Sequence, residues 1–117
     1  MKNLFTDVLI VGAGPTGLFL SNILASYNIK NLLVEKNSST VKEPRAVSID
    51  DESLRVLQSL GLINKFLNKI SINYGSYYIS PNGKNFAVID PTSKIYGFHK
   101  RNSFDQPDLE DLLLKNI

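Results

Sequence analysis

Three glycines near the start of the chain have the spacing of a phosphate-binding turn. Gly12, Gly14 and Gly17 follow the short apolar run 8–11. In such a turn the first glycine permits a sharp bend after a strand, and the second lets the backbone approach a pyrophosphate. The third lets the following helix pack closely, and the N–H groups at the start of that helix attract phosphate. The candidate contacts are Gly12, Ala13, Gly14, Pro15, Thr16 and Gly17.

An acidic residue stands where a dinucleotide site needs one. Glu35 follows Gly17 by 18 residues and closes the apolar run 32–34. Its carboxylate can accept hydrogen bonds from the ribose hydroxyls of an adenosine. Like-charge repulsion disfavours a 2′-phosphate there, although Lys36 beside it weakens that argument. This pattern predicts a dinucleotide site and leaves NAD and FAD open; a glycine turn kept only for close packing is the alternative.

The elements around the glycine turn predict a βαβ unit. The run 8–11 suits a strand buried on both faces of a parallel sheet, and Pro15 suits the first position of a helix. Asn28 tolerates the left-handed conformation that ends helices, and a second strand is expected at 32–34. The apolar stripe of the helix is predicted to comprise Leu18, Phe19, Ile23, Leu24 and Tyr27. The expected fold class is α/β, with a Rossmann-like βαβ unit and a right-handed crossover.

The rest of the chain predicts helices and a few antiparallel strands. Residues 36–44 are polar and indicate a loop, whereas acids at 50–52 indicate a helix start. That helix is expected to present an apolar face at 54, 57 and 60, to end at Gly61 and to be followed by a short helix at 62–67. Strands are expected before and after the turn 81–83, with a third possible at 95–98.

A last helix is expected to begin at Gln106. Its apolar face is predicted to comprise Leu109, Leu112, Leu113 and Ile117. Because that face continues to the final residue without a stop signal, we expect an incomplete domain.

The length, composition and charge of the chain exclude several other classes of function. The chain has 117 residues, no cysteine and a formal charge of +2. One domain at most is expected, and disulfides, thiolate metal sites and a cysteine nucleophile are excluded. Scattered basic residues argue against nucleic acid binding. The start lacks a secretory signal, and no apolar run approaches the roughly 20 residues that span a bilayer. A cytoplasmic location is expected. The sequence pattern gives no indication of the oligomeric state.

Several segments together resemble flavin-dependent aromatic hydroxylases, which are single-component FAD monooxygenases. Residues 7–18, 33–36 and 44–46 carry this likeness. Residues 44–55, 58–62, 101–104 and 106–107 resemble more narrowly the 3-(3-hydroxyphenyl)propionate hydroxylase branch. The Pro44-Arg45-Ala46 segment is much more specific than the glycine turn. The resemblance therefore favours FAD over NAD.

The resemblance also implies roles for single residues. The three glycines would hold the FAD pyrophosphate, Glu35 the adenosine ribose, Arg45 the phosphates and Gln106 the ribityl region. Lys36 is a further candidate for contact with the cofactor. A solvated surface charge is the alternative for Arg45, and an ordinary helix-start residue is the alternative for Gln106. Arg101 is a weaker candidate. His99, the only histidine, is expected at the surface, and the aromatic group is expected to be a sheet face: Tyr74, Tyr77, Tyr78 and Phe86.

The reaction implied by the resemblance is hydroxylation of a small phenolic aromatic acid with NADH or NADPH and O2. The later Asp-Gly and Gly-Asp segments of the family do not lie within residues 1–117. We therefore expect the N-terminal, truncated part of a GR2-type FAD-binding domain, inactive alone and without catalytic or metal-ligating residues. The alternatives are a product that competes with a full-length homologue, or half of an NAD-dependent dehydrogenase.

Overall fold

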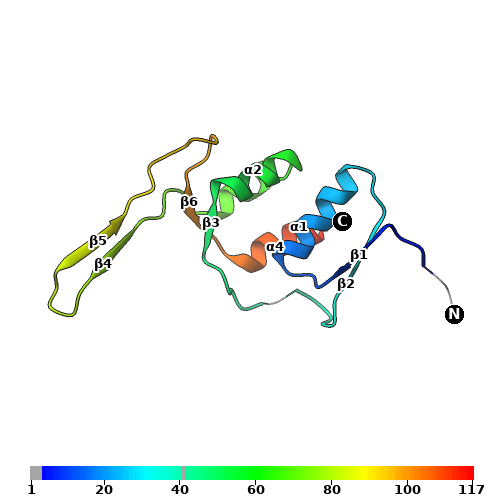
Figure 1. The fold of residues 1–117 in the computed structure, drawn as a ribbon, viewed down its shortest axis with the longest axis horizontal. Coiled ribbons are helices and arrows are strands. Elements are labelled where there is room, and N and C mark those ends of the chain that lie inside the picture. Colours follow the sequence, from blue (N-terminus) through cyan, green and yellow to red (C-terminus); the bar gives the residue numbers. More distant parts are fainter. Residues whose placement is uncertain (1–3, 41) are drawn as a thin grey trace. The chain divides into compact units, whose positions relative to one another are not determined.

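The computed structural model describes residues 4–40 and 42–117, so Met1 to Asn3 and Val41, part of the expected loop 36–44, lie outside it. The chain divides into two compact units. The first comprises the chain up to Arg45 together with Gln106–Ile117, and the second comprises Ala46–Asp105. Figure 1 labels most of the elements of both units.

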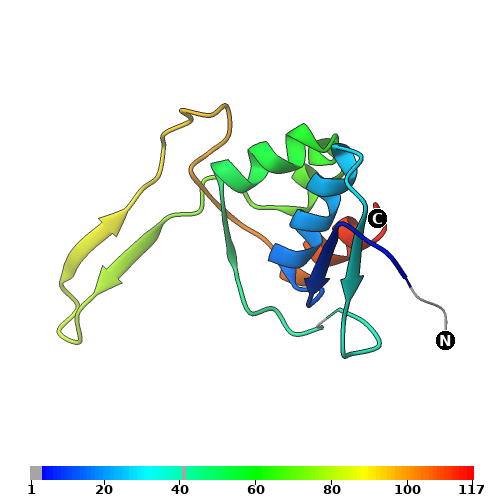
Figure 2. The ribbon, with the colours of Figure 1, turned by 45° about the vertical axis from the view of Figure 1, so that its right-hand side comes forward.

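The first unit contains the predicted βαβ arrangement. Strand β1 (Val8–Val11) is followed by helix α1 (Pro15–Ser26) and strand β2 (Asn31–Val34). The two strands are parallel, with Ile10 opposite Leu33, as Figure 2 shows. Pro15 is the first helical residue, and Asn28 adopts the left-handed conformation with a φ of 59°. The expected strand, helix, stop and parallel strand are therefore confirmed.

The buried face of α1 differs from the predicted apolar stripe. Its buried residues are Leu18, Ser21 and Asn22, whereas Tyr27 is 74% exposed. Ser21 donates from Oγ to Asn31 Oδ1 at 2.6 Å and so connects α1 to β2. The predicted stripe is confirmed at Leu18 and, as half-buried side chains, at Phe19, Ile23 and Leu24. It is wrong at Tyr27 and missed Ser21 and Asn22, whose hydrogen bonds offset the cost of burying them.

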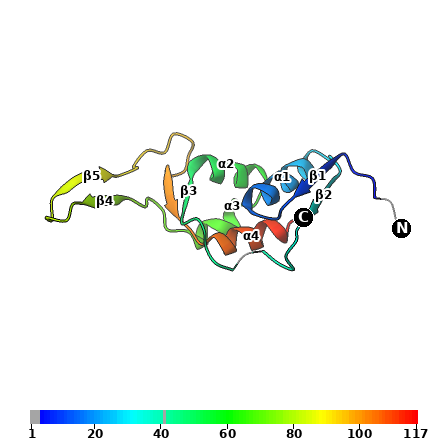
Figure 3. The ribbon, with the colours of Figure 1, turned by 60° about the horizontal axis from the view of Figure 1, so that its bottom comes forward.

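Helix α4 (Gln106–Leu114) packs beside α1 in the first unit, as Figure 3 shows. Asn22 joins the two helices: its Nδ2 donates to the carbonyl oxygens of Leu18 at 2.8 Å and Leu113 at 3.0 Å. Asn116 Nδ2 donates to Asn22 Oδ1 at 2.8 Å. The buried amide thus shares the Leu113 carbonyl, in the last turn of α4, with the backbone N–H of Asn116, which donates to it at 3.2 Å.

Of two expectations about apolar burial in this unit, the one for β1 was wrong and the one for α4 was confirmed in part. In β1 only Ile10 is buried, while Leu9 and Val11 are 58% and 81% exposed. The described residues form a sheet of two strands here, and α1 covers one face only. In α4 the buried apolar residues are Leu109 and Leu113, the helix ends at Leu114, and Ile117 is 58% exposed.

The second unit begins with a strand and a helix. Strand β3 (Ser48–Asp50) leads into α2 (Asp51–Ser59), where Asp50 Oδ1 accepts from the backbone N–H of Ser53 at 2.8 Å. Gly61 follows with a φ of 72°. Helix α3 (Ile63–Phe66) and the 3₁₀ turn η1 (Leu67–Lys69) match the expected short helix. The buried apolar residues of this unit are Ile49, Leu54, Leu57, Leu62, Ile63 and Phe66.

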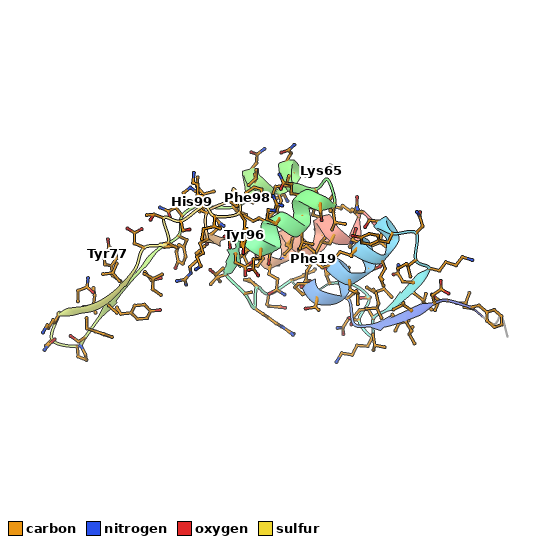
Figure 4. The ribbon with its side chains drawn as sticks, turned by 45° about the horizontal axis from the view of Figure 1, so that its top comes forward. Phe19, Lys65, Tyr77, Tyr96, Phe98 and His99 are labelled. Atoms are coloured by element: carbon orange, nitrogen blue, oxygen red, sulfur yellow. The ribbon has the colours of Figure 1, made fainter. Side chains whose placement is uncertain are left out.

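A β-hairpin forms around the predicted turn. Strands β4 (Ser76–Ile79) and β5 (Asn85–Ile89) are antiparallel. Gly83 has a φ of 79°, and its N–H donates to the carbonyl of Ser80 at 2.8 Å. The rings of Tyr78 and Phe86 lie 6.2 Å apart, so the sheet-face interpretation is confirmed for this pair. It is wrong for Tyr74, which precedes β4, and Tyr77 points to the opposite face from its neighbour Tyr78. Figure 4 shows Tyr77 projecting from β4, where it is 73% exposed.

Two strand expectations in the second unit were incomplete or wrong. Residues 95–98 form no strand, because Gly97 has a φ of 85° and closes a turn to the carbonyl of Lys94. Strand β6 (Arg101–Ser103) instead pairs antiparallel with β3. Each of these strands has three residues, which is too short for alternation to be visible in the sequence. Among the helices of the described residues, none has the length and apolar character that crossing a membrane requires.

Candidate functional site

The glycine turn between β1 and α1 opens a helix whose first N–H groups are not capped by a side chain. Gly12 has a φ of 107°, in the region that favours glycine, and its N–H donates to the carbonyl of Val34 at 2.8 Å. Gly14 precedes α1 with φ −76° and ψ 177°, an ordinary extended conformation. No side-chain hydrogen bond caps the start of α1. Free N–H groups and the positive end of the helix dipole can therefore bind phosphate.

Gly17 is required by a close contact with the turn. A Cβ built at this position would lie 2.1 Å from the carbonyl oxygen of Gly12 and 3.3 Å from Ile10 Cγ2. At Gly14 a Cβ would meet no atom within 4 Å. Packing within the chain therefore explains the absence of a side chain at Gly17 but gives no reason for its absence at Gly14.

Glu35 connects the end of β2 to the glycine turn. Its Oε2 accepts from the backbone N–H of Ala13 at 2.8 Å, and its Oε1 accepts from the backbone N–H and Nδ2 of Asn37, both at 2.9 Å. The hydrogen bond from Ala13, followed by that from Asn37, lowers the pKa of the Glu35 carboxyl below its ordinary value. The carboxylate therefore stays charged and holds the turn.

A cavity of about 420 Å³ in the first unit brings most of the predicted site residues together. Its volume lies within the range of small-molecule sites, about 300–1,000 Å³. Seven of the predicted residues line it: Ala13, Gly14, Pro15, Glu35, Lys36, Arg45 and Gln106. The glycine turn, the acid after β2 and the start of α4 thus form one concave site.

Arg45 and Gln106 meet although they are far apart in the sequence. The backbone N–H of Arg45 donates to Gln106 Oε1 at 3.0 Å. Gln106 is 4% exposed, whereas Arg45 is exposed. The surface-charge alternative for Arg45 is thus compatible with its exposure, and its predicted role toward phosphate stays a prediction.

The other predicted residues lie apart from this cavity. Gly12 lines a neighbouring cavity of about 400 Å³ together with Val11, Val34, Glu35 and Lys36. Thr16 and Gly17 line neither cavity. The sequence interpretation also missed four residues that line the larger one: Asn37, Ser39, Thr40 and Glu110. The spacing of four between Gln106 and Glu110 on a helix is the one signal that could have placed Glu110 there.

In the second unit Arg101 and His99 have local roles. Arg101 Nε donates to Ser48 Oγ at 3.0 Å, and its guanidinium lies 5.3 Å from the ring centroid of Tyr74. His99 is half-buried, its Nδ1 is buried without a described hydrogen-bond partner, and its position is labelled in Figure 4. Within the described part of the chain, no cluster of three or more potential metal ligands occurs.

Curated proteins of similar sequence are named as hydroxylases of aromatic acids. The chain is 40% identical over 111 residues to the 3-(3-hydroxy-phenyl)propionate/3-hydroxycinnamic acid hydroxylase of Comamonas testosteroni. It is 41% identical to the protein of the same name from Klebsiella pneumoniae. Each match covers 95% of this chain, and the chain spans 19–20% of the length of these relatives.

Solved structures show the same fold at lower identity. The p-nitrophenol 4-monooxygenase PnpA of Pseudomonas putida matches 99% of this chain with a TM-score of 0.82 and 20% identity, and 30% of that protein is covered. The flavin-dependent monooxygenase PieE, solved with FAD and substrate, matches 99% with a TM-score of 0.78 and 22% identity, and 22% of it is covered. The FAD binding domain family matches residues 5–117. The chain therefore belongs to the FAD binding domain family, and its cofactor is FAD.

Proposed function

We propose that residues 1–117 are the FAD-binding part of a flavin-dependent hydroxylase that acts on a phenolic aromatic acid with NADH or NADPH and O2. The observation that carries this proposal is the cavity of about 420 Å³, which joins the glycine turn, Glu35, Arg45 and Gln106. The relatives named as hydroxylases of 3-(3-hydroxyphenyl)propionate and 3-hydroxycinnamic acid support the class of substrate.

The groups that line the cavity suit the parts of FAD. The uncapped N-terminus of α1 would hold the pyrophosphate, and the exposed cations of Lys36 and Arg45 would oppose its negative charge. Glu35 has acceptor capacity beyond its bonds to Ala13 and Asn37, because each carboxylate oxygen has two lone pairs. It would accept from the adenosine ribose hydroxyls, and Gln106 would face the ribityl region.

The protein and the cofactor have different roles in the proposed reaction. FAD, when bound, supplies the electron transfer and oxygen activation that hydroxylation requires. The residues of this chain bind and orient it: α1 and the two cations hold the phosphates, and Glu35 holds both the turn and the ribose. The described residues contribute no group to which we assign a proton transfer, so their part is cofactor placement.

We also propose that residues 1–117 alone bind FAD weakly and do not hydroxylate. The chain spans about one fifth of its curated relatives, and apolar side chains of β1 and of the hairpin are exposed. A two-stranded hairpin with both faces in water is marginally stable alone. The exposed apolar faces of β1 and of the hairpin therefore suit contact with further protein surface, which we expect a complete enzyme to supply.

The test is to purify the chain, titrate it with FAD and follow the flavin absorbance and fluorescence. NADH and 3-(3-hydroxyphenyl)propionate are then added, and the mixture is assayed for a hydroxylated product. We expect saturable FAD binding without product. Absence of FAD binding, or binding of NAD in preference to FAD, would refute the assignment of the site. Product formation would refute only the proposed inactivity.

A further inference from the structure

A buried acid next to the cavity has no role in the proposed function. Glu110 is 1% exposed on α4 and lines the cavity. Its Oε1 accepts from Gln106 Nε2 at 2.7 Å, one helical turn earlier. Its Oε2 is buried and has no hydrogen-bond partner among the described residues. Among the described residues, only one of the two carboxylate oxygens of Glu110 is therefore hydrogen-bonded, and its partner is the Gln106 amide.

Two hydrogen bonds at opposite ends of the Gln106 amide favour one orientation of that amide. The backbone N–H of Arg45 can only donate, so it needs the amide oxygen at 3.0 Å. The Glu110 oxygen accepts from the amide nitrogen at the other end. A reversed amide would place an N–H group against the N–H of Arg45 and an oxygen against the oxygen of Glu110. The arrangement therefore has one favourable orientation.

Stabilisation of α4 alone does not explain why a buried acid stands at position 110. A pair at positions i and i+4 contributes little to a helix, whereas a buried polar oxygen without a partner costs considerably more. A leucine at position 110 would avoid that cost, but it could not hold the Gln106 amide. The hold on Gln106, and through it on the Arg45 backbone, is what an apolar residue cannot supply.

We propose that Glu110 is a positioning residue of the FAD site. By orienting the Gln106 amide it ties the backbone of Arg45 to α4 and so sets where the Arg45 cation stands at the cavity. The link runs from Glu110 through Gln106 to Arg45. This inference rests on the proposed function for its consequence in FAD binding, but the link itself exists without FAD.

The first test replaces the acid by an apolar residue of similar size. In Glu110→Leu we expect the Arg45 amide to exchange its hydrogen at least tenfold faster in NMR, and the Kd for FAD to rise about fivefold or more. The urea midpoint should stay equal or rise, since a buried unpaired oxygen is removed. Asp111→Leu, the same change at the exposed neighbouring position of α4, should alter neither the Arg45 exchange rate nor the Kd. Glu110→Gln keeps an acceptor oxygen and should retain most of the protection.

A second set of variants keeps every volume unchanged. Gln106→Glu sets two acids against each other and should expose the Arg45 amide to exchange. Adding Glu110→Gln lets residue 110 donate to residue 106, whose other oxygen accepts from Arg45, so protection should return. Unchanged Arg45 exchange in Glu110→Leu, or no coupling between positions 106 and 110, would overturn the proposal. Failure of the unaltered chain to bind FAD would instead overturn the proposed function, because the Arg45 exchange is measured without FAD.

Discussion

The addition of one methyl group should reduce stability at Gly17 and FAD affinity at Gly14, the two glycines at either end of the first turn of α1. In Gly17→Ala the new Cβ would lie 2.1 Å from the Gly12 carbonyl oxygen. A comfortable separation is above 3 Å, so the turn must move by about 1 Å. Overpacking of this kind costs about 1–3 kcal/mol. With a urea dependence of roughly 1–2 kcal/mol per molar, the midpoint should fall by about 1 M.

Gly14→Ala meets no atom within 4 Å, and the backbone angles of Gly14 suit any residue. Reduced freedom of the unfolded chain favours alanine by about 0.4–1 kcal/mol. The preference of the position before a helix for glycine over alanine opposes this by a similar amount. The urea midpoint should therefore change little. If a pyrophosphate approaches this backbone, the methyl group should weaken FAD binding at least tenfold, or about 1.4 kcal/mol.

The assay compares both variants with the unaltered chain by urea denaturation, followed by circular dichroism, and by FAD titration. Gly17→Ala should lose stability, and Gly14→Ala should lose affinity at unchanged stability. If Gly14→Ala binds FAD as tightly as the parent, the pyrophosphate does not approach the backbone closely at Gly14. If Gly17→Ala unfolds at the parent midpoint, the contact with the Gly12 carbonyl does not restrict the turn.

Further predictions concern single hydrogen bonds. Asn22→Asp replaces the Nδ2 donor with an acceptor facing the carbonyls of Leu18 and Leu113, so urea denaturation should show a loss of about 2–4 kcal/mol; a loss below 0.5 kcal/mol would contradict this. Asp50→Ala removes the N-cap of α2 and should lower stability by about 1 kcal/mol in the same assay. The Glu35 pKa is lower in the folded chain than its ordinary value of about 4.3. Its stabilising effect is therefore present above about pH 4.3 and is lost as pH falls through the lower folded pKa. Urea midpoints measured from pH 6 to 3 should fall more steeply for the parent than for Glu35→Gln, and parallel curves would contradict the role of the carboxylate.

The local elements of the first unit followed from the sequence because their causes are local. Pro15 starts α1, Asn28 ends it with a positive φ, and Gly12 takes the conformation that a sharp turn needs. The acids at the start of α2 were likewise correctly interpreted, since Asp50 caps that helix through Ser53. Such signals act within a few residues, so no knowledge of distant contacts is needed.

The same sequence also indicated the family, through the Pro44-Arg45-Ala46 segment, and predicted a dinucleotide site, because the spacing of the three glycines to Glu35 is that of one supersecondary unit. Tertiary structure alone decided that Glu35 holds the Ala13 N–H, that Asn22 is buried between α1 and α4, and that Glu110 orients Gln106 toward Arg45. The contact between Asn22 and Leu113, for example, joins residues that are 91 positions apart in the sequence. The type of a polar side chain does not reveal its hydrogen-bond partner, because folding alone brings the two groups within hydrogen-bonding distance.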